Sequence, residues 1–214
     1  DNLGHCILSG LLYGATTSIF SSLGITAIVF IIGTVLGVIA GYFGGVFDIV
    51  ISKITTVFQA FPRLIFAIAI AGVLGIGIGN TIFALCAMCW TEYARLSRSL
   101  VLSVKERTYI KAARVCGENH FIILIKHVFP NIFPSLIITS MLNIGAMLME
   151  VSALSYLGLG VKTPMAEWGD MMNLGKAYLQ TNPWLVFIPG IAIFVAVVIF
   201  NLFGEKLRDA LDLK

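Results

Sequence analysis

Side chains able to do metal or redox chemistry are few in this sequence, and their spacing builds no familiar centre. Cys86 and Cys89 have CxxC spacing within an apolar segment, but no second Cys or His pair lies nearby. Cys116 lies in a basic polar stretch, and four cysteines distributed in this way do not form a disulfide framework. We therefore expect free thiols that pack as small apolar side chains, and no metal site.

Acidic side chains within apolar segments are the next candidates for function. Glu150 is the one acid in the segment 131–154, and an ionisable group there is costly enough to suggest a role. The alternative places it near the outer end of its helix, where it caps the following turn or pairs with a partner subunit. For Glu92 we expect an interfacial pair with Arg95. The candidate residues for a translocation path are Glu150, Asn143 and Met147.

Catalytic and nucleotide-binding patterns are absent from the sequence. The nearest match to the phosphate loop GxxxxGK[ST] is 169–176, which has five intervening residues and is followed by Ala177. His5, His120 and His127 do not form a nucleophile-base arrangement with any Ser or Cys. We therefore expect no enzyme activity and no cofactor in this chain.

The segments that carry these side chains have the composition of membrane helices. Hydrophobic residues make up 58% of the 214, charged residues 12%, and the mean hydropathy is +0.97. No Asp, Glu, Lys or Arg occurs between Cys6 and Phe47, or between Leu64 and Thr91. A soluble domain would place polar residues every few positions. The composition predicts an all-α, polytopic membrane protein.

Five spans are expected from the need for about 20 apolar residues to cross the hydrocarbon. In the region 46–79, Lys53 and Arg63 would lie deep in a single helix. We therefore expect an interfacial amphipathic helix to Ala60, a break at Pro62, and a shorter span to about residue 78. The other four spans are 17–43, 80–101, 131–154 and 184–204.

Basic residues set the expected orientation, because short cytoplasmic loops are rich in Lys and Arg. We therefore place the connection richest in Lys and Arg in the cytoplasm. Because successive connections alternate between the two sides of the membrane, twelve of the fourteen basic residues, including Lys53, Arg63 and Lys206, are then cytoplasmic, and Asp1 lies outside. The two expected outside are Lys162 and Lys176. Seven gather in one connection: Arg95, Arg98, Lys105, Arg107, Lys111, Arg114 and Lys126.

The stretch 103–125 is too polar to enter the bilayer and has a helix-forming composition. Gly117 is expected to end one short helix, and Glu118 and Asn119 to begin the next. The result is a helix-turn-helix at the membrane surface. One interpretation is a positive-inside anchor alone, and the other is a contact for a partner.

Glycines at positions 33, 37 and 41 repeat every fourth residue within the first span. Such a stripe lets another helix approach closely. Helix packing is the expected role, and a backbone that lines a pore is the alternative.

Several motifs together resemble a known family. Ala112, Ala113, Gly117 and the residues 123–130 resemble the "EAA" loop of ATP-binding-cassette (ABC) importer permeases, with Lys111 where that family often has Glu. Eight further motifs look like the dipeptide, oligopeptide and nickel permease family, and the resemblance covers essentially the whole chain. They lie at 1–4, 12–14, 41–45, 61–62, 92–95, 154–160, 167–169, and 201–204 with 207–211.

The resemblance implies a single permease domain, 1–214, of a type I importer in the bacterial cytoplasmic (inner) membrane, with a coupling-helix loop at about 103–130. Six spans are usual in the family, so the first would lie upstream of Asp1. The expected protein partners are a second, unlike permease subunit and two ATP-binding subunits, which dock on the loop and hold ATP and Mg. An extracytoplasmic binding protein is expected to meet the outer loop at 164–169. Membrane lipid is also an expected partner, and nucleic acid is not. Where Lys111 replaces Glu, the partner surface is expected to be acidic. The expected ATPase contact is Lys111, Ala112, Ala113, Arg114, Gly117, Glu118 and Asn119.

The cargo implied by the resemblance is nickel or a metal chelate, moved into the cytoplasm by alternating access. The segments 166–169 and 143–145 look closer to nickel-type members. Two alternatives stay open: the same machinery importing di- or oligopeptides, and a passive channel, which would not need a coupling helix.

Overall fold

The computed structural model describes residues 4, 6–161 and 164–211, and every regular element in these ranges is helical. This confirms the all-α class. Asp1, His5 and Lys162, for which expectations were given above, lie outside the described residues. The elements are α1 (Ile7–Phe43), α2 (Gly45–Gln59), α3 (Arg63–Leu74), α4 (Ile78–Lys105), α5 (Thr108–Val115), α6 (His120–Ile122), a π-helical turn η1 (Ile123–Val128), α7 (Phe129–Tyr156), α8 (Trp168–Gly175), a 3₁₀ turn η2 (Lys176–Tyr178) and α9 (Trp184–Leu211).

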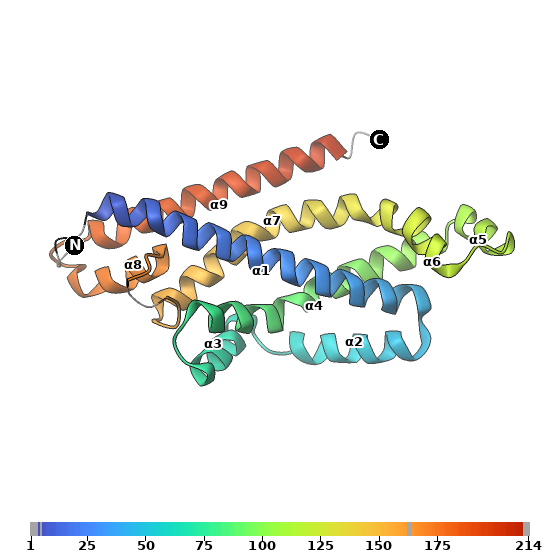
Figure 1. Ribbon diagram of the computed structural model, residues 1–214, viewed down its shortest axis with the longest axis horizontal. Coiled ribbons are helices and arrows are strands. Elements are labelled where there is room, and N and C mark those ends of the chain that lie inside the picture. The colour runs from blue at the N-terminus through green and yellow to red at the C-terminus, as the bar shows by residue number, and fades with distance from the viewer. Residues whose placement is uncertain (1–3, 5, 162–163, 212–214) are drawn as a thin grey trace.

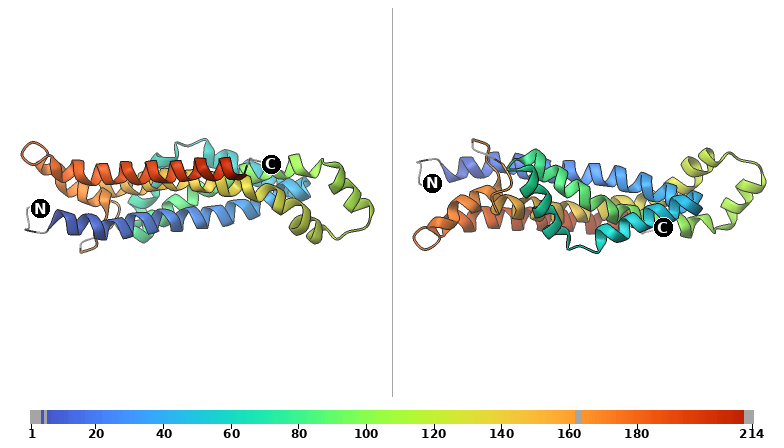
Figure 2. Two further views of the ribbon diagram at one scale, coloured as in Figure 1. Left: turned by 90° about the horizontal axis from the view of Figure 1, so that it is seen from above. Right: turned by 90° about the horizontal axis from the view of Figure 1, so that it is seen from below.

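The long helices α1, α4, α7 and α9 run lengthwise through an elongated bundle (Figure 1). The short helices α5 and α6 project at one end, and α8 lies at the other end beside the start of α1. Both views in Figure 2 show the same separation of the two ends. The basic connection therefore stands apart from the residues expected on the outer side.

Three described helical segments are long and apolar enough to cross a membrane: Ile7–Phe43, His120–Tyr156 and Trp184–Leu211. They contain the predicted spans 17–43, 131–154 and 184–204. At about 1.5 Å per residue, the 37 residues of α1 extend about 55 Å, well beyond a hydrocarbon core of about 30 Å. The helix begins ten residues before the expected span because no Pro or charge interrupts it. The expected span 80–101 forms part of α4, which carries Glu92 and Arg95 and does not meet the same apolar criterion.

The glycine stripe of α1 packs against α4, as predicted. A Cβ added to Gly33 would overlap the carbonyl oxygen of Trp90 and the Cβ of Tyr93. One added to Gly37 would overlap Ser97 and the carbonyl of Ala94. The missing side chains allow the two backbones to touch, which is how small residues hold helices together in lipid.

The region 46–79 differs from expectation in direction. The break is where it was predicted, since α2 ends at Gln59 and α3 begins after Pro62. However, α2 runs back alongside the bundle instead of lying across its end (Figure 1). The angle between α2 and α3 is 86°, so α3 crosses the bundle and the expected short span is not formed as a straight helix. Arg63 consequently lies beside α4 and α7, where its side chain is 38% exposed and paired with Glu92 and Glu150.

The outer end is organised by a buried carboxylate. Glu167 is 0% exposed, and its Oε1 accepts hydrogen bonds from the Ser18 Oγ at 3.0 Å and the Ser152 Oγ at 3.4 Å. Its Oε2 accepts one from the backbone N–H of Asp170 at 3.0 Å and caps α8. Trp168 is also buried and donates from Nε1 to the carbonyl of Leu11. At the start of α8, Glu167 and Trp168 of the outer loop therefore face α1 and α7 and not the surface.

Replacing Glu167 with Ala is expected to destabilise the outer end strongly. The substitution leaves two hydroxyls and a backbone N–H without their acceptor, and each buried unsatisfied donor costs about 1–3 kcal/mol. Thermal unfolding of the purified protein should show a Tm several degrees lower. The matched control is Glu205→Ala on the exposed surface of α9, for which the Tm should stay unchanged. An equal Tm for the two variants would contradict this structural role.

Candidate functional site

The cytoplasmic connection folds as a helix-turn-helix, as the sequence predicted. At the end of α5, the N–H of Glu118 donates to the carbonyl of Ala113 and the N–H of Gly117 to that of Arg114. These two bonds form a Schellman motif, which needs a left-handed residue at its turn. Gly117 supplies that conformation with φ +79°. The direction in which the chain leaves α5 is thereby fixed.

The second arm starts from a side-chain cap. The Asn119 Oδ1 accepts a hydrogen bond from the N–H of Phe121 at 3.0 Å, at the start of α6. The η1 turn then carries the chain into α7 without a break, so His120–Tyr156 is one continuous helical segment. His127 Nε2 lies 3.0 Å from Glu118 Oε2 and ties the η1 turn back to the connection. A force applied to α6 would therefore act directly on α7.

A second link joins the connection to α1. The Tyr42 hydroxyl, near the end of α1, lies 3.0 Å from His120 Nδ1. Arg114 stacks over the Tyr42 ring with its guanidinium 5.4 Å from the ring centroid, a cation–π distance. Lys105 Nζ donates to the backbone carbonyl of Tyr42 at 2.7 Å. Tyr42 is 3% exposed, so the connection is anchored on a buried side chain of the bundle.

Tyr42→Phe is expected to loosen this anchor without unfolding the chain. The variant keeps the ring beneath Arg114 but loses the hydrogen bond to His120, which is worth about 0.5–1.5 kcal/mol. We expect backbone amide hydrogen exchange in α5 and α6 to become several-fold faster. Tyr13→Phe, an exposed tyrosine at the opposite end of α1, should leave these exchange rates unchanged. Wild-type exchange rates in Tyr42→Phe would show that this hydrogen bond does not hold the connection in place.

The outward face of the connection is unexpectedly apolar. Val115 is 89% exposed and Phe121 is 68% exposed, and Ile122 and Ile125 are also largely open. Large apolar side chains this open on a polar connection are typical of a protein docking surface. None of these four residues is among those expected from the sequence to contact an ATPase. The sequence pattern that could have indicated this surface is the run of apolar residues on both sides of the turn at Gly117. A connection that served only as a surface anchor would have polar residues there.

The residues predicted to contact an ATPase lie around this apolar face. Ala112, Arg114, Gly117 and Asn119 are exposed, whereas Ala113 and Glu118 are partly buried. Ala113 packs against the core beneath the connection and so supports the surface from within. Lys111 forms an exposed ion pair with Glu106, with 2.9 Å between Nζ and Oε2, and this contact lowers the pKa of Glu106.

A partly exposed charge cluster joins three elements of the bundle. Arg63 lies directly after the break between α2 and α3, and its guanidinium contacts Glu92 Oε2 on α4 at 3.1 Å and Glu150 Oε1 on α7 at 2.5 Å. The Cys89 Sγ also lies 3.8 Å from Glu150 Oε2. Three helical elements are thus joined through one arginine. The expected Glu92 pairing with Arg95 is wrong, since the structure pairs Glu92 with Arg63.

Glu150 does not cap the turn that follows α7. That turn closes by its own Schellman motif, with bonds from the N–H of Leu159 to the carbonyl of Leu154 and from the N–H of Gly158 to that of Ser155. Glu150 instead forms an ion pair with Arg63 of the same chain. The sequence could not show this pairing, because Arg63 and Glu150 are 87 positions apart and the 86° turn of α3 brings them together.

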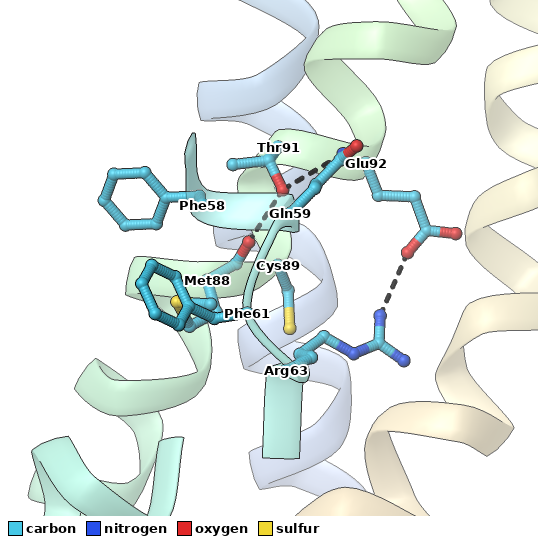
Figure 3. A pocket seen from close by; sticks show the side chains of 8 residues that line it. All are labelled: Phe58, Gln59, Phe61, Arg63, Met88, Cys89, Thr91 and Glu92. Carbon is cyan, nitrogen blue, oxygen red and sulfur yellow. Dashed lines mark hydrogen bonds and ion pairs between the residues drawn. The ribbon is translucent and has the colours of Figure 1, made fainter. Parts of the chain in front are cut away.

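A cavity of about 320 Å³ opens beside the cluster (Figure 3). Figure 3 shows Phe58, Phe61 and Met88 gathered on one flank, while Arg63 and Glu92 face each other on the other. The remaining lining residues are Gln59, Cys89 and Thr91. Of the other two path candidates, Asn143 donates to the Tyr93 hydroxyl at 3.3 Å, and Met147 is 1% exposed within the core. In this conformation, Met147 is therefore closed to the cavity.

The cysteines are free in the structure. Cys86 and Cys89 lie within α4, and Cys6 and Cys116 are exposed. Among the described residues, no group of three or more His, Cys, Asp or Glu side chains could hold a metal ion.

Comparison with known proteins agrees with this architecture. The model of the family "Binding-protein-dependent transport system inner membrane component" matches residues 33–213. The chain is 39% identical over 212 residues to the nickel transport system permease protein NikC of Escherichia coli (strain K12), covering 99% of this chain and 76% of that protein. It is 38% identical to the dipeptide permease DppC of Alkalihalophilus pseudofirmus and to the glutathione permease GsiD of Pectobacterium atrosepticum, covering all of this chain and 70% and 71% of those proteins.

Solved structures share the fold at lower identity. An inward-facing structure of the MetNI methionine ABC transporter has a chain with a TM-score of 0.70 and 16% identity, covering 94% of this chain and 97% of that one. A chain of an amino acid ABC transporter has a TM-score of 0.62 and 17% identity, covering 96% and 99%. The passive-channel alternative has no support among these similarities. The chain belongs to the family of binding-protein-dependent transport system inner membrane components, as a permease subunit of the dipeptide, oligopeptide and nickel ABC importers.

Proposed function

We propose that this chain forms one half of the translocation unit of an importer and is driven by ATP hydrolysis in partner subunits. The single observation that carries this proposal is the apolar, outward-facing surface of α5 and α6 on a connection fused to α7 and hydrogen-bonded to α1. A passive pore needs no such surface. The second permease subunit is an unlike homologue, and both subunits work in the bacterial cytoplasmic membrane.

The coupling mechanism follows from the two anchors of the connection. An ATPase subunit docks on Val115, Phe121 and the surrounding Lys111 to Asn119 stretch. When two ATPases close around ATP and Mg, they displace α5 and α6 together. The continuous helical segment to α7 and the Tyr42–His120 contact pass this displacement to α7 and α1. The bundle then exchanges an inward-open for an outward-open arrangement, which receives cargo from the extracytoplasmic binding protein.

For the cargo, we propose nickel carried as a chelate, with di- or oligopeptides as the second candidate. The nickel permease NikC is 39% identical to this chain, and the dipeptide and glutathione permeases are 38% identical. These values do not separate the two cargo classes. The mixed charges of Arg63, Glu92 and Glu150 favour a cargo that has charged groups of its own.

The test is the ATPase activity of the complete complex in liposomes. The binding protein would be supplied empty, loaded with a nickel chelate, or loaded with a dipeptide. We expect one loaded form to stimulate hydrolysis several-fold over the empty form and thereby to identify the cargo class. Equal hydrolysis with all three forms would contradict a binding-protein-dependent importer.

A further inference from the structure

The charge cluster lies midway along the bundle, where charges are expensive. Glu92 is near the centre of α4, with at least 13 residues, or about 20 Å at 1.5 Å per residue, on either side. Ionisable side chains at such a depth are rare in membrane proteins and mark substrate paths or water-filled cavities. Arg63, Glu92 and Glu150 together carry a net charge of −1 when ionised. One carboxylate charge of the cluster is therefore not neutralised by its arginine.

The cluster is also open to a ligand. The side chains of Arg63 and Glu92 are 38% and 47% exposed, whereas that of Glu150 is 14% exposed. An arginine has five N–H donors in a fixed planar fork. The two contacts to Glu92 and Glu150 use only part of this capacity. Arg63 can thus accept a further carboxylate while Glu150 holds it in place from the buried side.

The adjoining cavity gives such a ligand a place to lie. Its volume of about 320 Å³ is at the small end of the range of about 300–1,000 Å³ that small-molecule sites occupy. One flank is apolar, from Phe58, Phe61 and Met88, and the other presents Arg63 and Glu92 (Figure 3). An apolar wall with a few convergent charged groups is the usual composition of a specific small-molecule site.

We infer that Arg63, Glu92 and Glu150 form a cargo site within the permease for a small molecule that carries a carboxylate and a cationic centre. The carboxylate binds the free donors of Arg63, and the cationic centre binds Glu92, which is the more exposed of the two acids. A zwitterion of this kind adds no net charge, and its cationic centre pairs with the carboxylate charge that Arg63 leaves unneutralised. Two sources share this chemistry: a dipeptide, through its terminal carboxylate and ammonium, and a nickel chelate with amino-acid ligands. The inference rests on the proposed import function and assigns residues to it.

The position of the site at a helix break connects its occupancy to the transport cycle. Arg63 is the first residue of α3, and Phe58, Gln59 and Phe61 come from the end of α2 and the break itself. At this break, α2 and α3 meet at an angle of 86°. A movement of α2 relative to α4 would open or close the site, so cargo would be bound in one arrangement of the bundle and released in another.

The experiment measures equilibrium binding of radiolabelled alanyl-alanine and of a nickel–glycine chelate to the assembled complex in nanodiscs without the binding protein. Parallel assays measure ATP-driven uptake of both cargoes into liposomes with the binding protein present. The variants are Glu92→Gln and Arg63→Lys, which keep side-chain size or charge. The matched control is Lys206→Gln with Asp209→Asn, an exposed ion pair of 3.8 Å at the end of α9. Size-exclusion chromatography establishes that each variant assembles.

We expect at least one cargo to bind the wild-type complex. Both site variants should weaken that binding tenfold or more and raise the KM of uptake, while the control matches the wild type. The cargo affected identifies the source as peptide or chelate. Unchanged binding and KM in assembled Glu92→Gln and Arg63→Lys would overturn the site, even where ATP-driven uptake is intact. Absence of ATP-driven uptake in the wild type would instead contradict the proposed function, and the binding measurement would still decide the site.

Discussion

Gly37→Leu should prevent this chain from accumulating as a folded permease. A Cβ at Gly37 would overlap Ser97 Oγ and the backbone carbonyl of Ala94, and a leucine would add three more carbons to that contact. A backbone atom of α4 cannot move aside without separating the two helices. Overpacking in a close-packed core typically costs about 1–3 kcal/mol. Because α1 and α4 share the most extensive helix–helix contact in the bundle, a clash against the α4 backbone should cost more than that range. Membrane yield and size-exclusion profile of the tagged chain with its partners would show the loss.

Gly24→Leu is the matched control for this prediction. Gly24 lies in the same helix, but a Cβ there would meet nothing within 4 Å. The same substitution should therefore give a normal yield and a normal profile. If Gly37→Leu assembled as well as Gly24→Leu, the close contact between α1 and α4 would be wrong.

Phe121→Asp and Val115→Asp should each separate the permease from its ATPases. Both side chains are exposed in the isolated chain, so a carboxylate there does not disturb the core. In the complex, the same carboxylate would be buried without a partner. Truncating an anchor at the centre of an interface costs about 2 kcal/mol or more, which corresponds to about a 30-fold weaker association. ATPase subunits should no longer copurify with the tagged chain, and ATP-driven uptake should fall to background.

Phe121→Leu keeps an apolar side chain and should retain most of the association. The difference between Leu and Asp at one exposed position separates a docking role from a general effect on folding. Copurification of ATPases with Phe121→Asp at the wild-type ratio would show that α6 lies outside the interface.

The helical class could be predicted because composition decides it. Long runs without charge leave a helix as the element that satisfies every backbone group within lipid. The positions where helices break could also be predicted from the sequence. Pro62 cannot continue a helix and Gly117 accepts a left-handed backbone, so the ends of α2 and α5 followed from residue type.

The course of α2 could not be predicted from local sequence. Lys53 and Arg63 were placed at the interface because an unpaired charge in a membrane helix is costly. In the structure, Arg63 is paired with two acids, one from α4 and one from α7. The free-energy cost of placing the Arg63 charge among apolar helices is thus offset by Glu92 and Glu150, which are 29 and 87 positions away. A single sequence does not reveal such distant pairings.

The proposed docking surface lies in the stretch that the family resemblance assigns to an ATPase contact, but its exposed apolar side chains were not among the expected residues. The family resemblance assigns Ala112, Ala113 and Gly117 to the ATPase contact, and in the structure these residues shape the turn. The side chains that present the largest apolar area are Val115 and Phe121, and their exposure depends on how α5 and α6 are turned against the bundle. The Tyr42–His120 contact that sets this orientation joins residues 78 positions apart.

The most direct test of the central claim is cargo flux into liposomes that contain the complete complex. The liposomes would be loaded with ATP and Mg or with ADP and Mg, and the binding protein carrying nickel chelate or dipeptide would be added outside. With the orientation that presents the ATPases to the lumen, uptake toward the ATPase side should require ATP and the loaded binding protein, and should be lost in Phe121→Asp. Flux of equal size with ADP, insensitive to Phe121→Asp, would contradict a coupled importer and indicate a passive pore.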